Sequence, residues 1–105
     1  MFMNKLGKLR ESDKEIILGT INIFKENKLG IGIHGTSLWN PKYKDVDMLA
    51  VSKTNNVQDF DKALKELLKQ YKGKILEQKG DSTIGLDYDI KIGKLIVHLS
   101  FVILQ

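Results

Sequence analysis

The spacing of hydrophobic residues along the chain predicts two helices. Apolar residues at helical spacing favour a first helix over residues 13–27. Ser12 and Glu15 match a capping box at its start, and Gly30 is expected to mark its end. A longer apolar stripe over residues 57–71 predicts the second helix, with its hydrophobic side chains in the core.

Shorter apolar segments bounded by turn residues predict strands. The run at 48–51 has no polar interruption, which predicts a strand buried on both faces. Gly93 and Lys94 form a two-residue hairpin turn with glycine first. Further turns are expected at 35–37 and 80–82. The predicted strands are 31–34, 45–52, 74–79, 85–92 and 95–104. This order predicts an α+β domain with helices packed against a mixed, largely antiparallel sheet.

Length and composition restrict the chemistry that this domain can perform. The chain has 105 residues, enough for one domain with a modest core, and no cysteine. Disulfide frameworks, cysteine nucleophiles and cysteine-bound zinc are therefore excluded. Two histidines are too few for a three-histidine metal centre. Any catalysis must depend mainly on aspartate and glutamate.

The charge is mildly basic, and almost all of the positive charge is on lysine. The formal net charge is +4, and 17 Lys and Arg residues include a single arginine. This bias is compatible with anionic ligands such as nucleotides or RNA, but the absence of a dense basic run favours a solvated lysine-rich surface. The polar first ten residues do not resemble a signal peptide, and no apolar run is long enough to span a bilayer. We therefore expect a cytoplasmic protein without a membrane partner.

Three Asp-x-Asp triplets occur, and their predicted context separates them. Asp59 and Asp61 fall in the first turn of a helix, where residues two apart point in nearly opposite directions. Asp45 and Asp47 open a strand, where residues two apart share a face. Two adjacent carboxylates need a compensating cation, and Mg²⁺ prefers such oxygen ligands. The third triplet is Asp87 and Asp89.

The turn after the first predicted strand has the composition of a phosphate-binding loop. Gly35 allows a close backbone approach, and the hydroxyls of Thr36 and Ser37 can bind phosphate oxygens. Lys44 could bind the same triphosphate or only screen the neighbouring acid. His34, at the strand end, is expected to be structural.

Together these two features resemble the nucleotidyltransferase superfamily with the polymerase-β-like fold. Its Gly-Ser element maps onto Gly35 with Thr36 or Ser37, and its metal-binding pair maps onto Asp45 and Asp47, within residues 31–52. The resemblance implies a single minimal nucleotidyltransferase domain over residues 1–105. It implies transfer of a nucleoside monophosphate from a nucleoside triphosphate, with ATP as the expected substrate, to a hydroxyl. Mg²⁺ or Mn²⁺ would be the cofactor.

The family's third carboxylate has no direct match at its expected position in this sequence. Its position falls in Val97-His98-Leu99, where His98 stands in place of the acid. If Gly93 and Lys94 form the hairpin turn, Asp89 faces His98 across the two strands. Asp89 could then complete the metal site or orient His98 as a base. A shift of one residue in the pairing would send the acids of this strand to the other face.

The resemblance also implies an alternative to catalysis. The domain could be a catalytically impaired nucleotide-binding or interaction module, such as the antitoxin partner of a HEPN toxin. Because the chain is short, a homodimer mate or a separate HEPN-like subunit could supply the rest of the pocket. An RNA-binding domain that uses the lysine surface is a third hypothesis.

Overall fold

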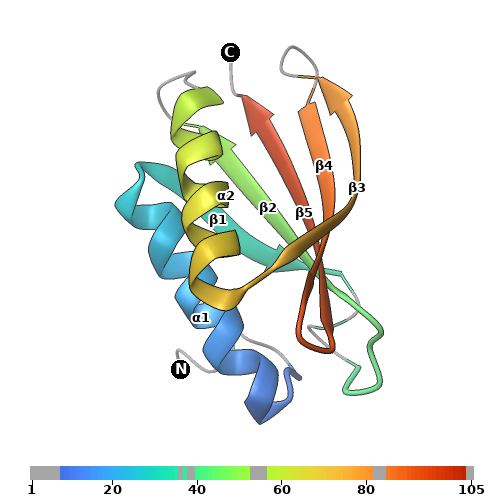
Figure 1. Cartoon of the computed structure of the whole chain (residues 1–105). Coiled ribbons are helices and arrows are strands. Elements are labelled where there is room, and N and C mark those ends of the chain that lie inside the picture. The colour runs from blue at the N-terminus through green and yellow to red at the C-terminus, as the bar shows by residue number, and fades with distance from the viewer. Residues whose placement is uncertain (1–7, 36, 38–39, 53–56, 82–84, 104–105) are drawn as a thin grey trace.

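The chain folds as two helices and five strands within the part that the structure describes. The structure is a computed structural model, and it describes residues 8–35, 37, 40–52, 57–81 and 85–103. The elements are α1 (Glu11–Glu26), β1 (Leu29–His34), β2 (Val46–Ser52), α2 (Val57–Tyr71), β3 (Lys74–Asp81), β4 (Gly85–Ile92) and β5 (Leu95–Ile103), as drawn in Figure 1. The predicted α+β class is confirmed.

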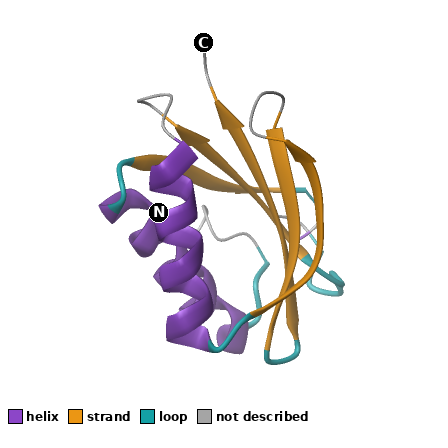
Figure 2. Cartoon of the chain, turned by 45° about the horizontal axis from the view of Figure 1, so that its top comes forward, coloured by secondary structure: helices purple, strands orange, loops and turns teal. Residues whose placement is uncertain are grey.

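The five strands form one mixed sheet in the order β1-β2-β5-β4-β3. Only β2 and β5 run parallel; the other three neighbouring pairs are antiparallel, as the sequence predicted. Strand β5 comes last in the chain but lies between β2 and β4. Both helices cover the same face of the sheet, where α1 packs against β1 and α2 (Figure 2). The opposite face, called here the open face, is not covered by a described helix.

Side chains alternate between the two faces along each central strand. On β2, Met48 and Ala50 point toward the helices and are fully buried, whereas Leu49 points to the open face and is 38% exposed. The expectation that this run is buried on both faces is therefore wrong, because the helices cover one face only. In the core, the Phe60 ring of α2 stacks on Phe101 of β5 with 4.3 Å between centroids.

The predicted start of α1 is also wrong. The helix begins at Glu11, and the Arg10 carbonyl accepts hydrogen bonds from the amides of Asp13 and Lys14 at 3.0 Å. Arg10 is the N-cap residue and makes no side-chain cap, so Ser12 does not form the capping box. The cause is a tertiary contact, because the buried Asp13 carboxylate accepts a hydrogen bond from the Tyr43 hydroxyl.

Two turns also differ from the sequence prediction. Helix α1 ends at Glu26, and Asn27 is its C-cap residue, whose side chain donates to the Ile23 carbonyl at 2.8 Å. Lys28 then takes the left-handed conformation with φ 67°. Gly30 is therefore not the helix end but part of β1. Strand β3 continues through Gly80 to Asp81, where a turn was expected.

The predicted hairpin between β4 and β5 is confirmed. Gly93 has φ 61°, and Ile92 pairs with Leu95 on either side of the two-residue turn. This turn fixes the register of the late hairpin and so decides which side chains share the open face. Among the described residues, no helix combines the length and apolar character needed to cross a membrane.

Candidate functional site

A row of polar side chains crosses the open face of the sheet at the end where β2 begins. The register places His34, Asp47, His98, Asp89 and Glu77 opposite one another on successive strands. Directly paired residues share a face, with Cβ atoms about 5 Å apart. Neither a single strand nor a single hairpin could assemble this row, because it needs β5 between β2 and β4. We take this row as the candidate active site.

Asp47 lies against the glycine turn that the sequence singled out. Gly35 has φ 84°, in the left-handed region that favours glycine. A Cβ built on Gly35 would come within 2.5 Å of Asp47 Oδ2. The bare backbone of Gly35 therefore provides the space that the Asp47 carboxylate occupies. The predicted neighbourhood of glycine turn and carboxylate is present in the structure.

Asp45 and Lys44 lie in the bend just before β2, and both are exposed. Asp45 is therefore outside the strand by one residue, although the sequence predicted it as the first strand residue. Within the described part of the chain, no group of three or more histidine or acidic side chains is arranged to enclose a metal. A donor set of one or two carboxylates still suits Mg²⁺, which takes its other ligands from water and substrate phosphates.

The remaining residues of the predicted phosphate loop are less accessible. Thr36 lies outside the described residues. Ser37 is 1% exposed, and its Oγ has no hydrogen-bond partner among the described residues. A buried hydroxyl without a partner costs about 1–3 kcal/mol, and a phosphate oxygen would be a suitable acceptor for it. Contact of Thr36 and Ser37 with a phosphate stays a prediction.

His98 is held by Asp89 and lies among further carboxylates. Its Nδ1 is 2.7 Å from Asp89 Oδ1, and its Nε2 is 3.7 Å from Asp87 Oδ1. The hydrogen bond with Asp89 raises the pKa of His98 above its ordinary value, and burial opposes this rise. The charges of Asp89, Asp47 and Asp87 raise the pKa further. The His98 ring is therefore held by one carboxylate and lies in a negatively charged environment that favours its protonated form.

The hairpin register predicted from the sequence is confirmed at this site. Asp89 faces His98, and Asp87 faces Ser100, whose hydroxyl donates to Asp87 Oδ1 at 2.5 Å. Asp89 lies two strands from Asp47, which is about 10 Å across a sheet. Of the two roles foreseen for Asp89, the structure therefore favours orientation of His98. Metal ligation by Asp89 stays a prediction.

A buried network that the sequence analysis missed fixes the loop before β2. Arg10 donates from its guanidinium to the Tyr43 carbonyl at 2.7 Å and lies over the Tyr43 ring, 4.2 Å from its centroid. The Tyr43 hydroxyl accepts from the Arg10 amide at 3.0 Å and donates to Asp13. Burial and the hydrogen bond with Asp13 raise the pKa of Tyr43. This network anchors the segment that leads into Lys44 and Asp45, and no local sequence motif predicts it.

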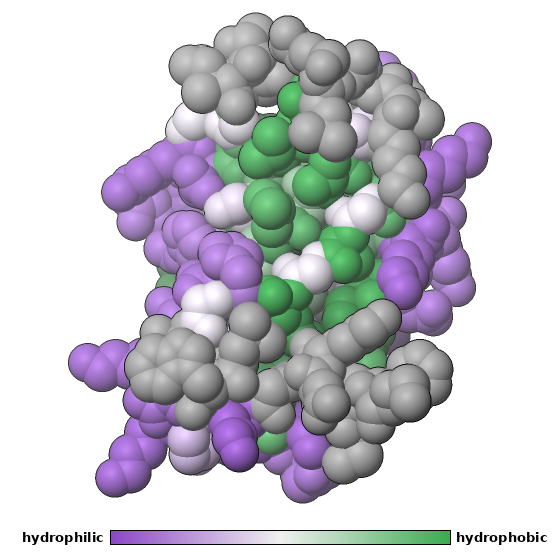
Figure 3. Space-filling view, turned by 180° about the vertical axis from the view of Figure 1, so that it is seen from behind, coloured by the Kyte–Doolittle hydropathy of each residue, from purple (hydrophilic) through white to green (hydrophobic). Residues whose placement is uncertain are grey.

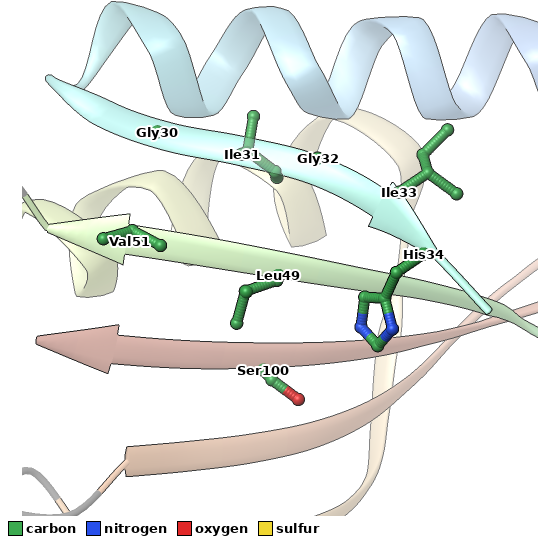
Figure 4. A pocket seen from close by; sticks show the side chains of 8 residues that line it. All are labelled: Gly30, Ile31, Gly32, Ile33, His34, Leu49, Val51 and Ser100. Carbon is green, nitrogen blue, oxygen red and sulfur yellow. The ribbon is translucent and has the colours of Figure 1, made fainter. Parts of the chain in front are cut away.

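An apolar hollow lies beside the polar row, along β1 and β2. Seen from behind, the open face carries a strip of hydrophobic residues between hydrophilic margins (Figure 3). The hollow has a volume of about 460 Å³. Six of the residues that line it are Gly30, Gly32, His34, Leu49, Val51 and Ser100. His34 stands at one end and Gly30 and Val51 lie toward the other (Figure 4).

Comparison of this chain with protein-family models and with curated proteins finds no match.

Proposed function

We propose that the chain is a nucleotidyltransferase-like domain that binds a nucleoside triphosphate, with ATP as the expected substrate, and transfers its monophosphate to a hydroxyl. The observation that carries this proposal is the Asp47 carboxylate, seated against the bare Gly35 turn and opposite His98 on the neighbouring strand. A glycine turn and a carboxylate at the same end of a sheet suit a triphosphate with its metal ion.

Different residues of the chain would bind the metal ion and the phosphates. Asp45 and Asp47 would hold Mg²⁺ or Mn²⁺, while the Gly35 turn and Lys44 would lie along the β- and γ-phosphates. The metal ion, when bound, supplies charge neutralisation at the phosphates. The Tyr43 network would keep Asp45 near Asp47, because it anchors the preceding loop to α1.

The pair of Asp89 and His98 supports a role in proton removal. In the proposed step, the acceptor oxygen forms a bond to the α-phosphorus, and the bond from that phosphorus to the pyrophosphate oxygen breaks. Pyrophosphate leaves with the electron pair, and the acceptor proton moves to Nε2 of His98. Asp89 holds the other ring nitrogen at 2.7 Å and stabilises the charged ring.

The test is a titration of Mg²⁺–ATP into the wild type and the double variant Asp45→Ala/Asp47→Ala. The wild type should bind ATP in a metal-dependent way, and the variant should lose that dependence. Asp59→Ala/Asp61→Ala on α2 is the matched control, because it removes the same charge and the same Asp-x-Asp pattern from another element. Metal-independent binding by the wild type, or equal affinity of the two double variants, would contradict the proposal.

A second candidate function is nucleotide binding without transfer, as in an interaction module such as the antitoxin partner of a HEPN toxin. The observation that favours it is His98, which occupies the position opposite Asp47 where the family carries an acid. Pyrophosphate release from ATP, measured with RNA and protein fractions as acceptors, separates the two functions. Activity that His98→Ala abolishes favours catalysis, whereas activity that appears only in His98→Asp favours the second candidate. A cytoplasmic location stays a prediction.

A further inference from the structure

The hollow on the open face contains a glycine that the fold itself does not need. Gly32 lies in the interior of β1, and its φ is outside the left-handed region in which four other described glycines fall. A Cβ built on Gly32 would meet no atom within 4 Å. Neither backbone conformation nor crowding within the chain therefore requires glycine here, although glycine weakens a strand. A strand glycine of this kind is typical of a place where a ligand approaches the backbone closely.

The surroundings of Gly32 define the shape and chemistry of that ligand. Gly32 pairs with Leu49, and both lie on the open face, so a flat strip of backbone adjoins an exposed apolar side chain. From Gly30 to His34 the strip spans five residues, and the four steps between them cover about 13 Å along a strand. The His34 ring reaches from the end of β1 across β2, and the Ser100 hydroxyl lies farther along the hollow (Figure 4). A flat ring with apolar faces and polar edges fits these walls.

The hollow is continuous with the candidate active site. His34 lines the hollow and pairs with Asp47, the carboxylate seated against Gly35. A nucleotide whose phosphates lie at Gly35 and Asp47 can therefore extend its nucleoside along β1 without leaving the open face. The volume of about 460 Å³ is within the range of small-molecule sites.

We propose that this hollow binds the nucleobase of the nucleotide, with the ring lying over Gly32 beside Leu49. This inference rests on the proposed function, because the identity of the ring follows from the phosphate site next to it. The base would contact the β1 backbone, and the apolar side chains of β2 would cover its edge. Gly32 would then be the residue that admits the ring.

The experiment uses three probes on the full chain: adenosine, Mg²⁺–tripolyphosphate and Mg²⁺–ATP. Adenosine alone should shift the amide NMR signals of residues 30–32 and 49–51. Gly32→Val should weaken adenosine and ATP binding at least about tenfold, equivalent to about 1.4 kcal/mol, because its side chain fills the space of the ring. Binding of Mg²⁺–tripolyphosphate should be unchanged. Gly32→Ala should give a smaller loss in the same direction.

Two controls test whether Gly32→Val acts by unfolding the chain or by adding an apolar side chain to the open face. Gly32→Val should keep the wild-type melting temperature or raise it, because valine favours strands and nothing in the chain lies in its way. Lys91→Val adds the same side chain to the open face at β4, away from the hollow, and should leave all three affinities unchanged.

The outcomes distinguish a failure of the proposed nucleobase site from a failure of the proposed function. Adenosine that shifts no signals in these strands, or a Gly32→Val variant that binds ATP as tightly as the wild type, would overturn the nucleobase site. Failure of Mg²⁺–tripolyphosphate to bind the wild type, with the adenosine shifts retained, would overturn the phosphate site and leave the hollow as a base-binding site.

Discussion

Replacement of Gly35 by alanine tests whether the close approach of backbone and carboxylate matters for binding. The new methyl would lie 2.5 Å from Asp47 Oδ2, about 1 Å inside a normal contact of about 3.5 Å. The φ of 84° adds about 1–2 kcal/mol for a residue with a side chain. Because the carboxylate is the mobile end of its side chain, we expect Asp47 to rotate away rather than the sheet to unfold.

The expected result has two separate parts. The free energy of unfolding should fall by about 1–3 kcal/mol, and the melting temperature by about 4–8 °C for each kcal/mol. The affinity for Mg²⁺–ATP should fall at least about tenfold, because Asp47, the proposed metal ligand, would be displaced. Thermal denaturation measures the first quantity, and calorimetric titration measures the second.

Gly93→Ala is the matched control for the backbone. Gly93 also has a positive φ, 61°, but a Cβ there would meet nothing within 4 Å. This variant should lose a similar amount of stability and keep the wild-type affinity for Mg²⁺–ATP. Equal nucleotide affinities of the two alanine variants would refute the reasoning, because the contact with Asp47 would then have no role.

Three further predictions concern the groups around the site and the core. Asp89→Asn should lower the pKa of His98 in an NMR titration. Because folding raises the pKa of wild-type His98, the protonated ring contributes stability that is fully present below pH 6.5. This stability is lost as the pH rises through the folded-state pKa. An unchanged pKa would show that Asp89 does not hold the ring. Tyr43→Phe should lower the free energy of unfolding in urea by about 1–3 kcal/mol, because the buried Asp13 loses its hydroxyl donor; a change within the error of the measurement would contradict this role. Phe60→Ala should cost about 3–5 kcal/mol in the same assay, because Phe60 stacks on Phe101 in the core, and a cost below 1 kcal/mol would argue against that packing.

Local sequence patterns predicted most helices and strands and the neighbourhood of Gly35 and Asp47. Helix α2, the strands of the late hairpin and the turn at Gly93 follow from periodicity and turn chemistry, which depend on neighbouring residues only. The pairing of Asp89 with His98 followed from the same turn, because a two-residue loop fixes the register. The nearness of Gly35 and Asp47 was predictable because Gly35 directly follows β1, and Asp47 lies on β2, the next strand and the antiparallel neighbour of β1.

Other features depend on contacts between residues far apart in the sequence, and these could not be read from local patterns. The start of α1 follows from the contact of Asp13 with Tyr43, a residue 30 positions away, which no local pattern records. Both helices lie on one face of the sheet, so Leu49 is exposed although its segment is apolar. The insertion of β5 beside β2 places His98 opposite Asp47, and it leaves Gly32 beside an open hollow. The last of these features depends on strand order, which is set by how the whole chain buries its apolar surface and not by the residues of any one segment.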